Sequence, residues 1–308
     1  MTSTGKGDSP VISLQGVTKA YGRIHALNGV GMTVERGELF GFLGPNGAGK
    51  TTTIRILTGF MRADAGAVLL FGQDAWRDSV TLKRRTGFVP DMAPVYGGLT
   101  GSEFLDYLAR LHGHRRPPLQ RDLLDRLQLS HETLGQKLKG YSHGMKQKVM
   151  LVQGMQHDPD LLIMDEPTDA LDPLMRQVFF SLVRDFRDRG HTVLMSSHVL
   201  SDVEEVCGRV ALIRGGRIVG EGLVEELRRG YTRTMWVEFR EPPTDGLTAP
   251  GIAVVSRNGN IWKLAITGDI NPALRELAAY DLVDLVFERT SLEELFMDYY
   301  QLEGRAGD

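Results

Sequence analysis

A glycine-rich turn between an apolar run and an amphipathic run constrains this chain more than any other stretch. Residues 39–43 predict a buried strand, and residues 53–57 predict a helix. The turn between them fits the spacing G-x-x-x-x-G-K-[ST]. Its members are Gly44, Pro45, Asn46, Gly47, Ala48, Gly49, Lys50 and Thr51, with Thr52 directly after them. In this strand–turn–helix setting the motif predicts a phosphate-binding loop in an α/β fold.

The residue types of this turn suit nucleotide phosphates. Gly47 and Gly49 lack a Cβ, so they can adopt positive φ angles and let backbone N–H groups converge on one point. The following helix adds unpaired N–H groups and the positive end of its dipole. Lys50 can reach the β- and γ-phosphates, Thr51 can bind Mg²⁺ through its hydroxyl, and Thr52 offers a second hydroxyl near the α-phosphate.

Composition excludes several classes of protein. The 308 residues are 42% hydrophobic and 24% charged, which is ordinary for a globular protein. This length allows one large domain with a small one, or two medium domains. The net charge of −3 gives no overall attraction to nucleic acid, and the single Cys207 excludes an intramolecular disulfide. No run approaches the ~20 apolar residues that cross a bilayer.

The first ten residues are polar and lack the apolar core of a signal peptide. We expect residues 1–10 to form a disordered lead-in and the protein to be cytoplasmic. If the protein acts at a membrane, another chain must supply the spanning helices.

Alternating runs precede the phosphate-binding turn, and helical patterns follow it. Residues 11–18 and 26–34 alternate as strands do, and Tyr21 lies between them, where its ring could stack on a purine or simply pack. From residue 99 to residue 141 the apolar spacing is helical, with Ser102 and Glu103 opening one helix. Ser142 is placed to cap another helix, which ends before Asp158. Residues 91–157 are therefore expected to form a helical insertion in the core.

Two carboxylates follow a run of four apolar residues, 161–164. Such a run predicts a buried parallel strand, and parallel strands present ligands at their carboxyl ends. Asp165 would then lie beside the phosphate-binding loop, where it can hold Mg²⁺. Glu166 could orient or deprotonate an attacking water. The strand predicted at 192–197 is followed by His198, which would point into the same crevice.

The order of these segments resembles that of the ATP-binding cassette (ABC) ATPases, over residues 11–230. The matching segments are Tyr21, the loop 44–51, the segment 87–91, the segment 141–147, the run 161–166 and His198. The resemblance implies a phosphate-loop mixed sheet with an antiparallel β subdomain and a helical insertion. The form Ser-x-Gly-Met-Lys-Gln at 142–147 looks like that of the subgroup serving two-component exporters with a separate membrane permease.

The resemblance also implies roles for residues around one bound ATP. Tyr21 would stack on adenine, and Lys50 would act in catalysis with Glu166 as the catalytic carboxylate. His198 would contact the γ-phosphate. ATP and Mg²⁺ are the ligands that follow from these assignments.

A second set of roles concerns a second cassette. Ser142, His143 and Gly144 would meet the γ-phosphate of ATP held by the second cassette, and Asp172 would lie across the dimer interface. The implied assembly is a head-to-tail dimer that encloses two ATP molecules. Both halves of a site are present here, which favours a homodimer, although pairing with a different cassette stays open.

Three residues depart from the family pattern. The family's glutamine before the helical insertion is here Asp91, which is shorter and anionic but can still contact Mg²⁺. His143 replaces the first glycine of the family's Ser-Gly-Gly-Gln. Asp169 stands where a small residue is commoner, before Ala170.

Residues 231–308 have a different character and predict a small α+β domain. Strands are expected at 234–239, 252–256, 261–266 and 282–287, with Asn258-Gly259 marking a hairpin. A helix is expected from Asn271-Pro272, and Ser291 with Glu294 would cap a last helix over 292–302. This segment is similar to the C-terminal extension of cassettes in drug and antibiotic exporters. A ligand sensor, a dimerisation aid and a stabilising cap are all open roles.

The resulting expectation is an ATP-hydrolysing subunit that energises a separate permease at the cytoplasmic face of the cell membrane. Export of a drug, antibiotic or lipid-like compound is favoured by the subgroup. The alternative is a cassette in a non-transport process, for example one linked to ribosomes or DNA. The single cassette, the absence of a heptad run and the negative charge all disfavour it. A phosphotransferase is disfavoured because the chain has no separate acceptor-binding motif.

Overall fold

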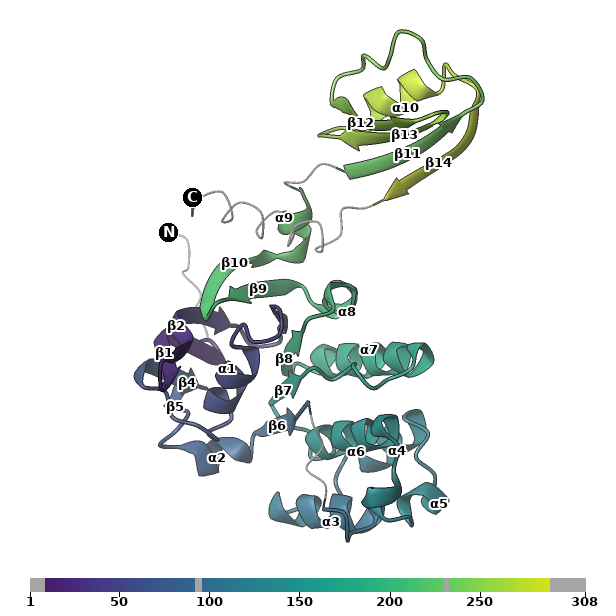
Figure 1. Ribbon diagram of the computed structural model, residues 1–308. Coiled ribbons are helices and arrows are strands. Elements are labelled where there is room, and N and C mark those ends of the chain that lie inside the picture. Colours follow the sequence, from purple (N-terminus) through teal and green to yellow (C-terminus); the bar gives the residue numbers. More distant parts are fainter. Residues whose placement is uncertain (1–8, 92–95, 230–232, 289–308) are drawn as a thin grey trace, which may run out of the picture. The chain divides into compact units, whose positions relative to one another are not determined.

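The computed structural model describes residues 9–91, 96–229 and 233–288 (Figure 1). Contacts divide the chain into two compact units, Met1–Leu223 and Val224–Asp308. Most of the expected lead-in, the predicted domain boundary at Gly230 and the predicted helix over 292–302 lie outside the described residues.

A six-stranded sheet forms the centre of the first unit. Its order is β10-β9-β3-β8-β7-β6, and every neighbouring pair is parallel except β9 with β10. The strands are β3 (Leu39–Leu43), β6 (Thr86–Val89), β7 (Leu161–Asp165), β8 (Thr192–Ser197), β9 (Arg209–Arg214) and β10 (Arg217–Leu223). Strands β3, β7 and β8 are buried along their whole length, as expected for parallel strands with helices on their faces.

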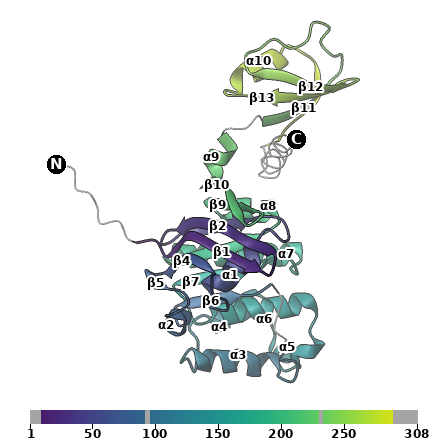
Figure 2. The same ribbon diagram turned by 60° about the vertical axis from the view of Figure 1, so that its left-hand side comes forward.

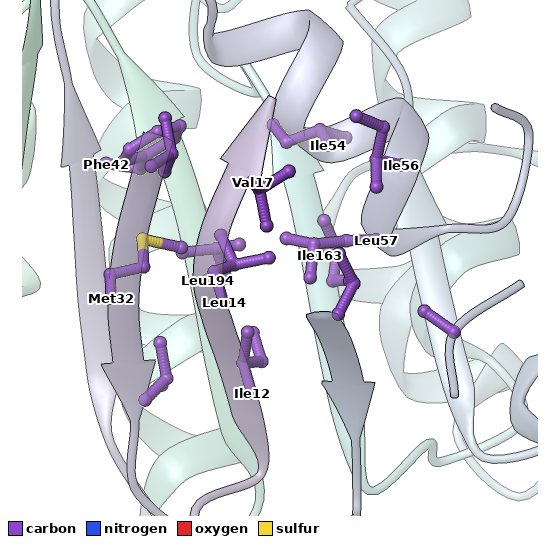
Figure 3. Packing of buried hydrophobic residues seen from close by; sticks show 14 of the residues in the cluster. Ile12, Leu14, Val17, Met32, Phe42, Ile54, Ile56, Leu57, Ile163 and Leu194 are labelled. Atoms are coloured by element: carbon purple, nitrogen blue, oxygen red, sulfur yellow. The ribbon is translucent and has the colours of Figure 1, made fainter. Parts of the chain in front are cut away.

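A second, antiparallel sheet covers this core. Its order is β2-β1-β4-β5, with β1 (Ile12–Tyr21), β2 (Ile24–Val34), β4 (Ala65–Leu70) and β5 (Gln73–Asp74). Helix α1 (Lys50–Leu57) lies between the two sheets. Figure 3 shows how Leu14 of β1, Phe42 of β3, Ile54 of α1 and Leu194 of β8 meet there, and all four are almost fully buried. The apolar runs of the sequence therefore build one shared core.

Helices gather beside β6 in both views (Figures 1 and 2). They are α3 (Gly101–Leu111), α4 (Gln120–Arg126), α5 (His131–Leu134), a 3₁₀ turn (Leu138–Gly140) and α6 (His143–Met155). Helix α6 packs closely on β6, since a Cβ on Gly87 would lie 2.0 Å from the Gly154 carbonyl oxygen. The remaining helices of this unit are α2 (Ser79–Lys83), α7 (Pro173–Asp188) and α8 (Leu200–Val206).

Helix α3 begins earlier than its sequence suggested. Thr100, rather than Ser102, caps the helix, because its hydroxyl accepts a hydrogen bond from the Glu103 N–H at 3.2 Å. The Glu103 carboxylate accepts one from the Thr100 N–H at 2.8 Å. In a capping box the acid stands three positions after the cap, and Thr100 has that spacing from Glu103 whereas Ser102 does not. The prediction that Ser142 caps α6 is confirmed.

The second unit is a four-stranded antiparallel sheet with a helix on one face. Its order is β12-β13-β11-β14, with β11 (Arg233–Phe239), β12 (Ile252–Asn258), β13 (Ile261–Ile266) and β14 (Leu282–Glu288). Helix α10 (Asn271–Leu277) contributes Ala273 and Leu277 to a core with Phe239, Trp262 and Leu264. Helix α9 (Val224–Arg229) precedes the sheet. The hairpin predicted from Asn258-Gly259 joins β12 to β13, with Gly259 at φ 57°.

Across the residues that the structure describes, no helix combines the length and apolarity that crossing a bilayer requires.

Candidate functional site

The loop between β3 and α1 has the backbone that its glycines predict. Gly47 and Gly49 have φ angles of 80° and 115°. A Cβ on Gly49 would lie 2.8 Å from the Ala26 carbonyl oxygen, and one on Gly44 would lie 2.4 Å from that of Ile213. Helix α1 begins at Lys50 without any side-chain cap, so its first N–H groups are available to an anion.

Lys50 is buried and turned toward its own loop. Its Nζ donates hydrogen bonds to the carbonyl oxygens of Gly44 at 2.5 Å and Pro45 at 3.3 Å. The same nitrogen lies 3.1 Å from Oε1 of Glu166, at an ion-pair distance but without the alignment of a hydrogen bond. A buried ammonium beside a phosphate-shaped loop is the charge that a polyphosphate needs.

Asp165 lies at the end of β7, where it pairs with Ser196 of the neighbouring strand β8. Its Oδ1 accepts a hydrogen bond from the Ser196 hydroxyl at 2.6 Å, and the Thr51 hydroxyl also bonds to this carboxyl. Burial raises the pKa of Asp165 above its ordinary value. The nearby Glu166 and Asp91 carboxylates raise it further, whereas the two hydroxyls lower it. A buried carboxyl among acidic neighbours lacks a compensating cation.

The donor set fits Mg²⁺. Thr51 and Asp165 meet at the phosphate loop, and the exposed Asp91 is near enough to affect the same carboxyl. These are hydroxyl and carboxylate oxygens, the ligands that Mg²⁺ prefers. Thr51, Asp165 and Asp91 are therefore the residues that would hold the ion.

Glu166 follows Asp165 in an unusual backbone conformation. Its φ is 48°, in the left-handed region, and its N–H donates to the Ser196 hydroxyl at 3.1 Å. Its Oε2 accepts hydrogen bonds from the backbone N–H of His198 at 3.1 Å and from ring atom Nδ1 at 2.9 Å. Its Oε1 is buried and has no hydrogen-bond partner among the described residues. The structure therefore brings Lys50, Glu166 and His198 together, as the sequence predicted.

The start of α6 is fixed to the loop after Glu166. The Ser142 hydroxyl accepts a hydrogen bond from the Met145 N–H at 3.2 Å, and Gln147 Nε2 donates to the Pro167 carbonyl at 3.0 Å. A Cβ on Gly144 would lie 2.9 Å from the Ala170 carbonyl oxygen, so this position also needs glycine for packing. Ser142 and His143 are exposed, and within the described parts of the chain neither forms a hydrogen bond to the phosphate loop.

Tyr21 and Asp172 lie outside this cluster. Tyr21 ends β1 with its side chain 44% exposed, and its hydroxyl donates to Met61 Sδ at 3.0 Å. Asp172 caps α7, where its Oδ1 accepts from the Met175 N–H at 2.9 Å. Asp172 therefore has a structural role as a helix cap in its own chain, in addition to any role toward a second cassette.

Ser196 near the cluster escaped sequence reasoning, whereas Asp169 was noted from the sequence only as a departure from the family pattern. Ser196 bonds to both Asp165 and the Glu166 N–H, because β7 and β8 pair with Asp165 opposite Ser196. Asp169 lies with one carboxylate oxygen 4.0 Å from Nδ1 of His198. The available signal was the position of Ser196 near the end of a buried strand, but only strand order reveals its partner.

A groove of about 580 Å³ is the second candidate site of this unit. It is lined by residues of α1, β4, α2, β6, α3 and α6, and most of these are apolar. Phe60 and Leu111 line it and are 60% and 65% exposed. Monomeric surfaces seldom expose large apolar side chains in one concave place, so the groove indicates a partner surface.

A stacked histidine pair lines the same groove. The rings of His112 and His157 have centroids 3.9 Å apart. Burial lowers the pKa of His157 to about 4, and the neighbouring His112 lowers it further. Both ring nitrogens of His157 lack a hydrogen-bond partner among the described residues. His157 is therefore neutral at neutral pH, which suits an apolar occupant.

Comparisons with known proteins agree with this geometry. A family model described as ABC transporter matches residues 27–169. An uncharacterized ABC transporter ATP-binding protein of Synechocystis sp. is 34% identical over 281 residues, which cover 89% of this chain and 78% of that protein. The daunorubicin/doxorubicin resistance ATP-binding protein DrrA of Streptomyces peucetius is 37% identical over 220 residues, covering 70% of this chain and 66% of that protein.

Solved structures share the fold. An ATP-binding subunit of an ABC transporter aligns with a TM-score of 0.66 and 30% identity, over 71% of this chain and 92% of that chain. The dimeric cassette MJ0796, in a post-hydrolysis state with ADP and Pi, aligns with a TM-score of 0.63 and 24% identity, over 69% of this chain and 98% of that chain. The predicted fold class is confirmed. The chain therefore belongs to the ATP-binding proteins of ABC transporters, and it is an ATPase of that family.

Proposed function

We propose that this chain hydrolyses ATP at the Lys50–Glu166–His198 cluster to drive a separate permease that exports a drug, an antibiotic or a lipid-like compound. The observation that carries the proposal is the buried Glu166, whose Oε1 faces Lys50 at the phosphate loop and lacks a hydrogen-bond partner among the described residues. The drug-resistance relative DrrA supports the substrate class.

The roles of the cluster follow from its charges. A bound polyphosphate competes for the Lys50 ammonium, because phosphate oxygens carry more negative charge than the loop carbonyls that Lys50 now contacts. Glu166 then has Oε1 available to orient an attacking water and accept its proton. Before a water is bound, Glu166 holds His198 through Nδ1, and this orientation directs the other ring nitrogen to the γ-phosphate.

Thr51, Asp165 and Asp91 would hold Mg²⁺. This ion, when bound, neutralises charge on the phosphates. The protein's own contribution is to aim the two carboxylates and the hydroxyl, which Ser196 assists through its hydrogen bond to Asp165.

The complete site includes a second copy of the chain. Ser142 caps the 13-residue helix that begins with His143 and Gly144, and Ser142 and His143 are exposed. The N-terminus of such a helix attracts anions. A head-to-tail homodimer gives this helix the γ-phosphate of the ATP on the other copy. Tyr21 stacks on the adenine, and Asp172 lies at the interface.

The apolar groove beside α3 and α6 receives a cytosolic helix of the permease. Phe60, Leu82 and Leu111 supply apolar contacts, and the neutral His157 adds no charge. The chain then acts as a peripheral subunit at the cytoplasmic face of the cell membrane. Its net charge of −3 offers no general attraction to nucleic acid.

Purified Glu166→Gln protein tests the hydrolytic role. Gln keeps the shape of Glu but cannot accept a proton, so turnover should fall at least about 100-fold while ATP binding is retained. Phosphate release measures the turnover, and a nucleotide-binding assay measures whether ATP binding is retained. Light scattering should report a dimer with ATP and a monomer without it. An undiminished rate of hydrolysis would show that Glu166 is not the base.

Capture from native membranes tests the permease. Tagged Glu166→Gln protein with Mg-ATP is incubated with detergent-solubilised membranes, and recovery of a multi-helix membrane protein is expected. Adding Phe60→Glu, which places a charge in the groove, should abolish the recovery. Val80→Glu, at an exposed residue outside the groove, is the matched control and should leave the recovery unchanged. Recovery of soluble proteins alone, with ATP binding intact, would favour the non-transport alternative.

A further inference from the structure

Asp169 forms a compact group with Glu166 and His198. One ligand atom from each of the three residues lies within 4.8 Å of the other two. His198 Nδ1 is 2.9 Å from Oε2 of Glu166 and 4.0 Å from Oδ1 of Asp169. One ring nitrogen therefore faces two carboxylates, of which only Glu166 now accepts its hydrogen bond.

Glu166 cannot act on water while both of its oxygens are engaged. Oε1 faces Lys50 at 3.1 Å, and Oε2 accepts two hydrogen bonds from His198. A phosphate draws Lys50 away from Oε1, but rotation of the carboxylate toward water also loosens its hold on Nδ1. The histidine ring then needs another acceptor to keep its orientation.

Asp169 is placed to be that acceptor. The Asp169 carboxylate lies 4.0 Å from Nδ1, within ion-pair distance. Burial and the Glu166 charge raise the pKa of Asp169, and His198 lowers it. The loop that carries it is held at both ends. The Leu171 N–H donates to the Thr168 carbonyl at 3.0 Å, and the Ala170 carbonyl lies against Gly144 at the start of α6.

The charge of a second carboxylate also matters for His198. A carboxylate also holds the Nδ1–H more firmly than a neutral acceptor does, because a hydrogen bond with a charged partner is roughly twice as strong as one between neutral groups. The small neutral residue that is commoner at this position would not supply the charge.

We propose that Asp169 is a positioning residue, which takes over the Nδ1–H of His198 when Glu166 turns to the attacking water. Nε2 of the ring then stays directed at the γ-phosphate. This inference rests on the proposed roles of Glu166 and His198. It assigns Asp169 no contact with the substrate.

Kinetics provide the first test. Asp169→Asn is nearly isosteric and removes only the charge, and Asp169→Ser restores the small residue. Both should lower kcat roughly tenfold, the usual cost of losing the partner that orients a histidine, with KM for ATP within about twofold. Asp169→Glu should recover about half of the rate. Asp188→Asn, at an exposed carboxylate that pairs with Arg187, is the surface control and should match the unaltered chain.

A spectroscopic test separates positioning from a merely structural role. Protein with Glu166→Gln, ATP and ¹⁵N-labelled histidine is stable against turnover, and its His198 signals are assigned by comparison with His198→Gln. The Nδ1 signal of His198 should shift when Asp169→Asn is added, because the acceptor of its N–H changes from a carboxylate to a neutral amide. The circular dichroism melting curve of Asp169→Asn serves as the folding control.

Both readouts must change for the proposal to stand. An unchanged kcat in Asp169→Asn would overturn it, and so would unchanged ¹⁵N signals of His198. Failure of the proposed function looks different. In that case Glu166→Gln keeps its turnover, while the ¹⁵N signals still report whether Asp169 contacts His198.

Discussion

At the scale of single residues, the site contains a backbone conformation and a buried carboxyl that are both unfavourable for the free energy of folding. Glu166 has a left-handed φ of 48°, which non-glycine residues seldom adopt. Asp165 is buried among other carboxylates, and its pKa is raised. Ser196 holds both residues through one hydroxyl. These features make sense together when a cation and a polyphosphate complete the site.

The raised pKa of Asp165 has a consequence for stability. Because the unfolded chain releases this proton at a lower pH than the folded chain does, the free energy of unfolding falls as the pH rises from the ordinary carboxyl range. Asp165→Asn removes this penalty and keeps an acceptor for Ser196. Its Tm should exceed that of the unaltered chain by about 2–4 °C at pH 7, and the gain should vanish on acidification toward pH 4.

Asp64 is a control whose pKa is shifted in the opposite direction to that of Asp165. Hydrogen bonds from the Lys19 ammonium at 2.6 Å and from the Ala20 N–H at 2.7 Å hold its pKa below the ordinary value. Asp64→Asn should therefore lower Tm at pH 7, and this loss should disappear as the pH falls below the ordinary carboxyl pKa and through the lowered pKa of the folded chain. Thermal melts from about pH 2 to pH 7 measure both variants. If Asp165→Asn also lowered Tm at pH 7, burial would not be the dominant influence on Asp165.

At the scale of elements, the site depends on which strand ends are neighbours. β3 lies between β8 and β9, and β7 lies beyond β8, so the phosphate loop and the ends of β7 and β8 meet at one edge of the sheet. Parallel strands bring their carboxyl ends together, which is why ligands bind there. Helix α6 connects this edge to the apolar groove, since it begins at Ser142 and contributes Met150 to the groove.

The packing of α6 on β6 predicts a sharp difference between two glycines. A Cβ on Gly87 would lie 2.0 Å from the Gly154 carbonyl oxygen, so Gly87→Ala must separate helix from strand. We expect a loss of about 1–3 kcal/mol in unfolding free energy. Gly140 has no neighbour within 4 Å of a Cβ position, so Gly140→Ala should be nearly neutral. Urea titrations compare the two. Equal stability of the two variants would contradict the close packing.

At the scale of the whole molecule, two cores are built from separate parts of the chain. The core of the first unit draws on β1–β4, α1 and the central sheet, whereas that of the second draws on its own sheet and α10. Each unit therefore has the means to hold its own fold. Calorimetry of the full chain should show two transitions rather than one.

Two tryptophans of the second sheet test this independence. Trp262 is buried, with its ring edge-on to Phe239 at 5.3 Å, so Trp262→Ala should cost about 3–5 kcal/mol in the second unit. Trp236 is 37% exposed, so Trp236→Ala should cost far less. ATP hydrolysis by the first unit should remain within about twofold in both variants. Loss of hydrolysis in Trp262→Ala would show that the units depend on each other.

Much of the site could be predicted because its parts are local. The phosphate loop and the Ser142 cap each lie within a few residues, where backbone chemistry and spacing decide the conformation. The predicted start of α3 lay one residue too late, at Ser102 instead of Gly101, because two hydroxyl residues, Thr100 and Ser102, both precede Glu103. Only the three-residue spacing of the box distinguishes them.

The sequence by itself determined which chemical groups this protein brings to ATP: a glycine loop with Lys50 and Thr51, two carboxylates after a buried strand, and a histidine after another. Tertiary structure alone decided that Ser196 holds Asp165 from 31 positions away and that Asp169 faces His198. It also decided that residues of six elements, α1, β4, α2, β6, α3 and α6, line one apolar groove. The physical reason is that spacing along the chain fixes local backbone geometry, whereas strand order and helix packing choose the neighbours of residues far apart in sequence.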